Sequence, residues 1–222
     1  MKRNFNKSVV LFVVGLLASS ASFAQPAGQL YDPEPPSDSA YVRVIITGVD
    51  GAVDVAVDGK ARLAKLRSGA VSDYLVLKAG PRELSLQLGG KSSKHKVDVV
   101  QGKAMTLAFD GLKAESKPIV FMDTANTNKL KSGLAFYNLD TKAGTQDVTT
   151  ADGATKVFTA VAAGAGGFIQ VNPISVDLLA NKASAKLSMT QGATYSVFLL
   201  PAGAGKSKLL ALQNMNERYT GK

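Results

Sequence analysis

Pairs of turn-forming residues recur at short intervals along this sequence, and they leave room only for short strands between them. The pairs in the first half are Asp50-Gly51, Asp58-Gly59, Gly80-Pro81, Gly89-Gly90 and Gln101-Gly102. Between two of them, Val53, Val55 and Val57 alternate with Asp54 and Ala56 at the period of two that marks a half-buried strand. Turn signals every eight to twelve residues are typical of a β-sandwich or barrel. Long helices are not visible, so we predict an all-β fold.

The second half of the chain repeats the plan of the first. Val97–Leu107 and Leu187–Val197 each contain an apolar alternation, a Gln-Gly turn and a further strand. We infer an internal duplication with a period of about 90 residues, which is the size of a domain. The prediction is therefore two tandem β-sandwich (Ig-like) domains, at residues 40–115 and 116–222. The joint is expected at Lys113–Pro118, and Asp123–Ser132 is expected to be a surface loop.

Residues 1–24 have the pattern of a secretory signal peptide. A basic start precedes the apolar run Val9–Leu17, and small residues flank an expected cleavage site after Ala24. The apolar run is too short to span a bilayer, so we expect cleavage, export and a mature chain without a transmembrane segment. Residues 25–39 contain four prolines and are expected to form an extended leader. The absence of cysteine excludes a lipid-bearing Cys and any disulfide framework.

The chain is basic, with 26 Lys and Arg residues against 17 Asp and Glu residues. Such a balance favours contact with polyanions, and it equally favours solubility. One basic group, a ridge of four lysines with an arginine across the hairpin, is a candidate contact for an anionic polysaccharide or a partner. Its members are Arg82, Lys91, Lys94, Lys96 and Lys103. The alternative is a solvated edge that lysines guard against aggregation. Nucleic acid is not expected, because aromatic residues are not interleaved with the basic ones.

Candidate catalytic residues are scarce. The single histidine, His95, stands among lysines on an expected hairpin rim, so we expect it to be solvated rather than part of a Ser-His-Asp arrangement. One histidine without any cysteine does not make a zinc site. The sequence contains no G-x-S-x-G elbow. We therefore predict no catalytic residue, no metal and no cofactor.

Two further motifs are better explained as turns. Gly203–Ser207 superficially resembles a P-loop, but its spacing is wrong and Pro201 favours a flexible hairpin. Asp50, Asp58 and Asp152 each precede glycine, which is a hairpin signal rather than a calcium-loop pattern.

Three segments carry a resemblance to a known family. They are Leu30–Pro36, the strand Ser39–Val44 that follows it, and Val53–Gly59. Together they resemble the AlgF family, the periplasmic accessory proteins of alginate O-acetylation, over nearly all of the mature chain. The Val53–Gly59 segment also resembles a broader class of exported β-sandwich domains.

The resemblance implies a soluble periplasmic protein needed for adding acetyl groups to alginate. Its implied partners are SGNH-type acetyltransferases and the membrane-bound acyl carrier machinery, and the chemistry would lie in those partners. Our first hypothesis is a non-enzymatic adaptor that bridges them. The second is a carbohydrate-binding module that holds an anionic polysaccharide such as alginate through the basic ridge. The third, acetyl transfer by this chain, lacks a nucleophile motif.

Overall fold

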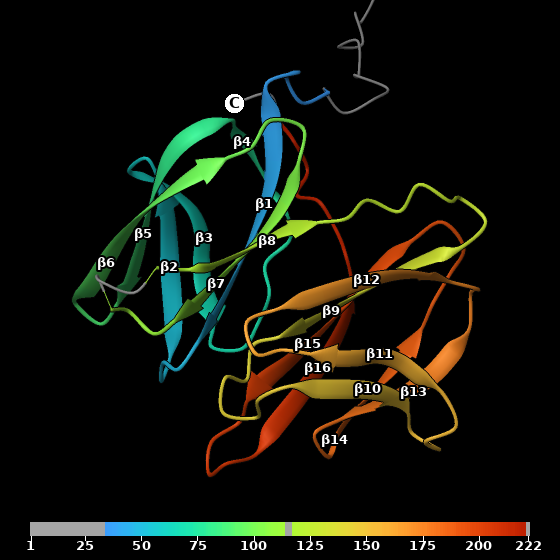
Figure 1. Cartoon of the computed structure of the whole chain (residues 1–222). Helices are drawn as coiled ribbons and strands as arrows, with labels where there is room; N and C mark the ends of the chain where they lie inside the picture. The colour runs from blue at the N-terminus through green and yellow to red at the C-terminus, as the bar shows by residue number, and fades with distance from the viewer. Residues whose placement is uncertain (1–33, 114–116, 221–222) are drawn as a thin grey trace, which may run out of the picture. The chain divides into compact units, whose positions relative to one another are not determined.

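The computed structural model describes residues 34–113 and 117–220 of the 222-residue chain. The expected signal peptide at 1–24 and most of the expected leader at 25–39 lie outside these residues. In the described part every regular element is a strand, and the strands form four sheets of four (Figure 1). The all-β prediction is confirmed. No helix capable of crossing a membrane occurs in the described ranges.

The first eight strands form one sandwich, coloured blue to green in Figure 1. One of its sheets has the order β4-β1-β7-β8, and the other has the order β3-β2-β5-β6. β1 and β7 are parallel neighbours, and the remaining pairs are antiparallel. The strands are β1 (Ser39–Thr47), β2 (Ala52–Val57), β3 (Lys60–Arg67), β4 (Leu75–Lys78), β5 (Gly80–Leu88), β6 (Lys91–Val99), β7 (Ala104–Asp110) and β8 (Ile119–Asp123). Val42, Val44, Leu84, Leu86 and Leu107 lie in the core between the two sheets.

The second sandwich repeats this topology strand for strand. Its sheets have the orders β12-β9-β15-β16 and β11-β10-β13-β14, with β9 parallel to β15. The strands are β9 (Ser132–Asn138), β10 (Gln146–Thr150), β11 (Lys156–Val161), β12 (Gly166–Val171), β13 (Ser175–Ala180), β14 (Ala183–Ser188), β15 (Thr194–Pro201) and β16 (Ser207–Gln213). Each strand occupies the place of the strand numbered eight lower, so the predicted duplication and the two tandem sandwiches are confirmed.

The Asp-Gly turns behave as the sequence indicates. Asp58 and Gly59 join β2 to β3, and their φ angles of 50° and 77° are those of a type I′ hairpin turn. The Asp58 carboxylate accepts the backbone N–H of Glu83 and a hydrogen bond from Arg82. The N–H of Glu83 and, after it, Arg82 hold the pKa of Asp58 below its usual value. The hairpin predicted at Gly203–Ser207 is also present, between β15 and β16.

A third hydrophobic cluster joins the two sandwiches through the outer faces of their parallel-strand sheets. Ile45 of β1 and Phe121 of β8 belong to it, together with Tyr137 of β9 and Phe198 of β15. The rings of Phe121 and Tyr137 are 4.9 Å apart and nearly perpendicular. Every residue of β9 is buried. Because β1 and β9 have a sandwich core on one face and the partner sandwich on the other, both read as nearly continuous apolar runs. The described residues form one compact unit.

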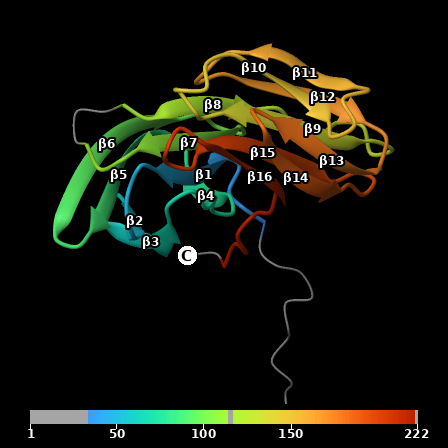
Figure 2. The same cartoon turned by 90° about the horizontal axis from the view of Figure 1, so that it is seen from below.

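Two segments connect the sandwiches along the chain. β8 follows the segment 113–118, where the sequence analysis expects the domain joint, yet it pairs with β7 and extends the sheet of the first sandwich. The chain enters its second sandwich only after β8. Figure 2 shows the two sandwiches side by side. Residues 114–116 lie outside the described part, and the boundary itself stays a prediction. After β16 the chain returns to the first sandwich, where Asn216 forms a bridge with Tyr74 beside β4.

Candidate functional site

A buried arginine lies at the centre of the contact between the two sandwiches. Arg43 of β1 is 1% exposed, and its guanidinium donates four hydrogen bonds. Nε donates to Thr106 Oγ1 at 2.7 Å, and Nη1 donates to Asn214 Oδ1 at 2.8 Å. Nη2 donates to Ser196 Oγ at 2.9 Å and to Tyr137 Oη at 3.1 Å. One side chain of the first sandwich thus binds three residues of the second half of the chain.

The negative charge that faces this cation comes from Asp123, at the end of β8. Its carboxylate accepts hydrogen bonds from Tyr74 at 2.7 Å, Tyr137 at 2.7 Å and Thr106 at 2.6 Å. Its Oδ2 is 3.9 Å from Arg43 Nε. Burial raises the pKa of Tyr74 and of Tyr137, and the Asp123 carboxylate raises both further. Both phenols therefore remain protonated and serve as donors.

The duplicated halves contribute equivalent residues to this network. Thr106 and Ser196 hold the same place in β7 and β15, and each hydroxyl accepts from Arg43 and donates onward. Thr106 donates to Asp123, whereas Ser196 donates to Asn214. Asp123 stands opposite Ala104, and the N–H of Asn214 donates to the carbonyl of Thr194, which holds the place of Ala104 in β15, so the two acceptors occupy corresponding positions. One position is a carboxylate and the other an amide, so a single cation meets a single buried negative charge.

This arrangement has the properties of a joint rather than of a catalytic centre. The side chains of Arg43 and Asp123 are only 1% and 6% exposed, so a substrate does not reach them. The guanidinium of Arg43 and the carboxylate of Asp123 are both hydrogen-bonded to surrounding side chains, as buried charges require. The Arg43 guanidinium also lies over the ring of Tyr74, 4.6 Å from its centroid. This network was not predicted, because its residues come together from distant parts of the chain.

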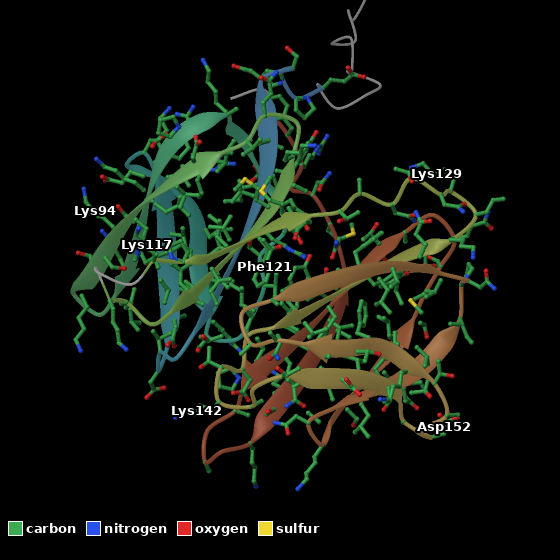
Figure 3. The ribbon with its side chains drawn as sticks, in the orientation of Figure 1. Lys94, Lys117, Phe121, Lys129, Lys142 and Asp152 are labelled. Carbon is green, nitrogen blue, oxygen red and sulfur yellow. The ribbon has the colours of Figure 1, made fainter. Side chains whose placement is uncertain are left out.

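The residues of the predicted basic ridge are only partly brought together. Lys94 and Lys96 share the outward face of β6, with Lys91 at the start of that strand and Lys103 beyond the turn at its other end. Arg82 does not join them, because its guanidinium binds Asp58 and the backbone carbonyls of Lys78 and Ala79. Lys94 is paired with Glu83 at 2.8 Å (Figure 3 labels Lys94). A role of this ridge in binding remains a prediction.

The expectation that His95 is solvated is wrong. The residue is 6% exposed and faces the interior of the first sandwich. Its ring centroid is 4.9 Å from that of Phe109, and Nε2 lies 3.0 Å from Ser93 Oγ. The alternation of β6 explains the error, because the lysines on either side of His95 point outward and an intervening residue must then point inward.

A groove of about 590 Å³ lies where the ends of β1 and β7 meet the loop after β9 and the β15–β16 hairpin. Lys117, Lys142 and Lys206 line it from three different segments (Figure 3 labels the first two). The Asp140 carboxylate, also in the lining, is already bound by the hydroxyl of Ser207. The lining also includes the exposed Asp110, so three lysines stand with two aspartates in this groove. Within the described ranges no three potential metal ligands come together.

Comparison with known proteins gives consistent matches. The sequence profile of the family described as "Alginate O-acetyl transferase AlgF" matches residues 13–195. A protein of Pseudomonas putida named Alginate biosynthesis protein AlgF is 30% identical over 80% of this chain and 77% of its own length. The protein of that name from Pseudomonas fluorescens is 30% identical over 79% of this chain and 76% of its own.

A solved structure of the C-terminal domain of AlgF from P. aeruginosa aligns over 39% of this chain and all of its own length. It does so at 24% identity and a TM-score of 0.34. The family profile and the two relatives extend over most of the chain and do not depend on that structural match. The chain belongs to the AlgF family.

Proposed function

We propose that this protein is a non-catalytic adaptor in the O-acetylation of alginate, that it acts in the periplasm, and that it bridges acetyltransferase components. Membership of the AlgF family supports the pathway, because the family description and the names of the relatives refer to alginate O-acetylation and alginate biosynthesis. The partners proposed are the SGNH-type acetyltransferases and the membrane acyl carrier machinery that the family resemblance implies.

The Arg43 network is the observation that carries the adaptor role. An adaptor has to hold two binding surfaces at a fixed distance and angle, and a flexible linker between two domains does not do so. Here Arg43 and Asp123 make a buried connection between the sandwiches that includes residues from both halves of the chain. Breaking such a connection is expensive, because it leaves a buried charge without a partner. The outer surfaces of the two sandwiches are therefore presented in one defined relation.

The side chains suited to proton transfer support the same proposal. His95 is packed in the interior of the first sandwich against Phe109. The phenols of Tyr74 and Tyr137 have raised pKa values and are committed to Asp123. Acetyl transfer requires a nucleophile within hydrogen-bond reach of a base, at a place where substrate can bind. These three side chains do not provide such an arrangement.

The test uses an alginate-producing bacterium that lacks this gene and carries a tagged copy of the full chain. We expect the tagged chain to co-purify with acetylation enzymes, and loss of the gene to reduce the acetyl content of alginate while polymer is still made. The purified chain is expected to show no acetyl transfer to alginate and no hydrolysis of an acetyl ester. Sustained turnover by protein freed of contaminants would replace the adaptor with an enzyme.

Binding of the polysaccharide is a second candidate function, and the lysine-lined groove favours it. Lys117, Lys142 and Lys206 line this groove from separate segments together with Asp110 and Asp140, and none of the three lysines belongs to an ion pair of the described residues. Binding of a polyanion weakens steeply as salt rises, whereas an interface with an apolar core does not. Calorimetric titration with purified alginate at low and high salt separates the two candidates.

A further inference from the structure

β8 is an edge strand without the usual protection. Edge strands expose backbone N–H and C=O groups, and proteins normally guard them with charged residues. The edge strands β3 and β6 are guarded by several lysines and arginines, and β4, β11, β14 and β16 each carry a lysine. From Ile119 to Met122, β8 carries no charge, and the Asp123 that follows is buried in the Arg43 network. β12 is also uncharged, but its large apolar side chains pack against the clusters of the molecule.

Two side chains of β8 form part of an apolar patch, on the face of the sheet that carries the core residues Leu107 and Met105 of β7. Val120 and Met122 are 44% and 51% exposed, and Val100, at the end of β6, is 40% exposed. The backbone N–H of Val100 contacts the sulfur of Met105, which stands opposite Met122 in the sheet, so Val100 lies near this end of β8. We call Val100, Val120 and Met122 the β8 edge patch. Half of the six strongly exposed large apolar side chains of the described part belong to it.

The second sandwich shows what normally covers such an edge. There β14 and β16 run close together, and Leu209 of β16 is buried while Ala211 packs against the core. Their counterparts in the first sandwich, β6 and β8, do not approach each other in this way (Figure 1). The first sandwich is therefore open on the side that its duplicate closes with its own strand.

The opposite edge of the same sheet already accepts an extended segment. Beside β4, the N–H of Tyr74 donates to the carbonyl of Met215, and the N–H of Glu217 donates to the carbonyl of Tyr74. The Glu217 carboxylate accepts the N–H of Val76 and pairs with Arg62. An extended stretch of chain that includes Glu217 thus covers the edge at β4. No described segment does the same at β8.

The charges around the patch indicate what kind of segment would fit. Lys113 and Lys117 precede β8, and Lys103 lies beside its far end, where Ala104 pairs with Asp123. All three lysines are exposed, and none of the ion pairs of the described residues includes them. A segment with apolar residues at alternate positions and acidic residues at its ends would complement both the patch and these lysines.

We propose that the free edge of β8 is a docking site for an extended segment of a partner protein, with alternating apolar residues and acidic flanks, which adds to the sheet as a further strand. This inference rests on the proposed adaptor function and assigns it a surface. Backbone hydrogen bonds would provide affinity, and the contacts with Val120 and Met122 would provide specificity.

The experiment places a photo-crosslinking amino acid at Val120 of the full chain in alginate-producing cells, with Ile174 as the matched control. Ile174 is 56% exposed and lies in the second sandwich. We expect the Val120 position to crosslink to one segment of an acetylation protein with the stated pattern, as read by mass spectrometry of the joined peptides. Met122→Glu should reduce this product about tenfold, since it removes apolar contact and adds a like charge, while Ile174→Glu should not.

The remaining outcomes overturn the inference in distinguishable ways. Equal products at Val120 and Ile174, a product with a second copy of this chain, or a product removed by alginate lyase would each refute it. A double variant Val120→Glu/Met122→Glu that keeps the wild-type urea unfolding midpoint and still co-purifies with the acetylation enzymes at the wild-type level would refute the docking site at β8. That result would leave the proposed adaptor function intact. If the wild-type chain recovers no acetylation enzyme, the proposed function fails as well.

Discussion

The two sandwiches share their topology and differ in what they place at their common boundary. Arg43 of β1 corresponds to Ala135 of β9, since these residues stand opposite the equivalent Thr106 and Ser196. Ile45 corresponds in the same way to Tyr137. The first sandwich therefore contributes the cation, and the second contributes a small residue that leaves room for it. Duplication supplied two equal faces, and substitutions at a few positions made them complementary.

The halves also differ in how their edges are closed. The second sandwich closes one side with β14 and β16, whereas the first relies on residues 214–217 at β4 and leaves β8 uncovered. The second sandwich is thus closed on that side by its own strands, and the first is closed at β4 by residues that follow the second. The first sandwich is the half that we expect to depend on contacts with other parts of the chain or with partners.

The largest effect should come from removing the cation that distinguishes the two faces. Arg43→Met leaves Asp123 buried without its partner, so we expect the free energy of unfolding to fall by about 3–5 kcal/mol. Urea denaturation of the purified protein measures this. Arg67→Met, at an exposed arginine of β3, is the matched control and should change stability by less than about 0.5 kcal/mol. A similarly small effect at Arg43 would show that the network does not hold the sandwiches together.

Exchanging the two equivalent acceptors tests whether the faces are related as we describe. Asp123→Asn alone should cost about 3 kcal/mol, because the buried guanidinium loses its counterion. Asn214→Asp alone should also destabilise, because two carboxylates then face one cation. The double variant restores one charge of each sign and should be more stable than Asp123→Asn by at least about 1 kcal/mol. Additive losses in the urea midpoints would contradict the equivalence.

Alkaline pH should weaken the boundary through its phenols. The pKa values of Tyr74 and Tyr137 are raised in the folded protein, so their contribution to stability is complete below pH 10. Above about pH 10 the unfolded chain loses these protons and the folded chain keeps them, so stability falls by up to about 1.4 kcal/mol per pH unit for each phenol. Tyr137→Phe should halve this slope, as measured by urea denaturation between pH 9 and 11. If the pH dependence of stability is unchanged in Tyr137→Phe, the alkaline loss of stability does not come from this phenol.

The smallest expected effect concerns the segment that closes the β4 edge. Glu217→Ala removes the acceptor of the Val76 N–H and the partner of Arg62, both in partly exposed surroundings. We expect a loss of about 1 kcal/mol. Faster amide hydrogen exchange at Val76, with no change in the strands of the second sandwich, would locate the effect at this edge. An equal increase of amide exchange in both sandwiches would contradict a role of Glu217 confined to the β4 edge.

Much of the fold follows from local patterns. The turn pairs and the period-two alternation are properties of adjacent residues, so many of the strands of the first sandwich, the Asp58-Gly59 hairpin and the duplication could be predicted. β8 was not predicted, because Ile119–Met122 is a short apolar run without alternation. Such a run does not distinguish a strand from other buried segments.

The boundary between the sandwiches could not be predicted in the same way. Tyr41–Ile46 is apolar at almost every position, which indicates burial on both faces, and the single arginine in it was the available signal. Its acceptors are far away in the sequence, so no local pattern identifies them. The burial of His95, by contrast, could be predicted locally. It stands between Lys94 and Lys96 in a strand, and the alternation of side chains places it on the opposite face from these lysines.

The return of the C-terminal segment to the first sandwich has a consequence for the order of folding. Synthesis produces β1 first, but the Asn214 that accepts a hydrogen bond from Arg43 is 171 residues further along. The bridge between Tyr74 and Asn216 spans a similar stretch of chain. Contacts between such distant residues form slowly, because a long loop must close before they contribute. We therefore expect the sandwich that is made first to reach its final state last, once the second sandwich and the residues after it are in place.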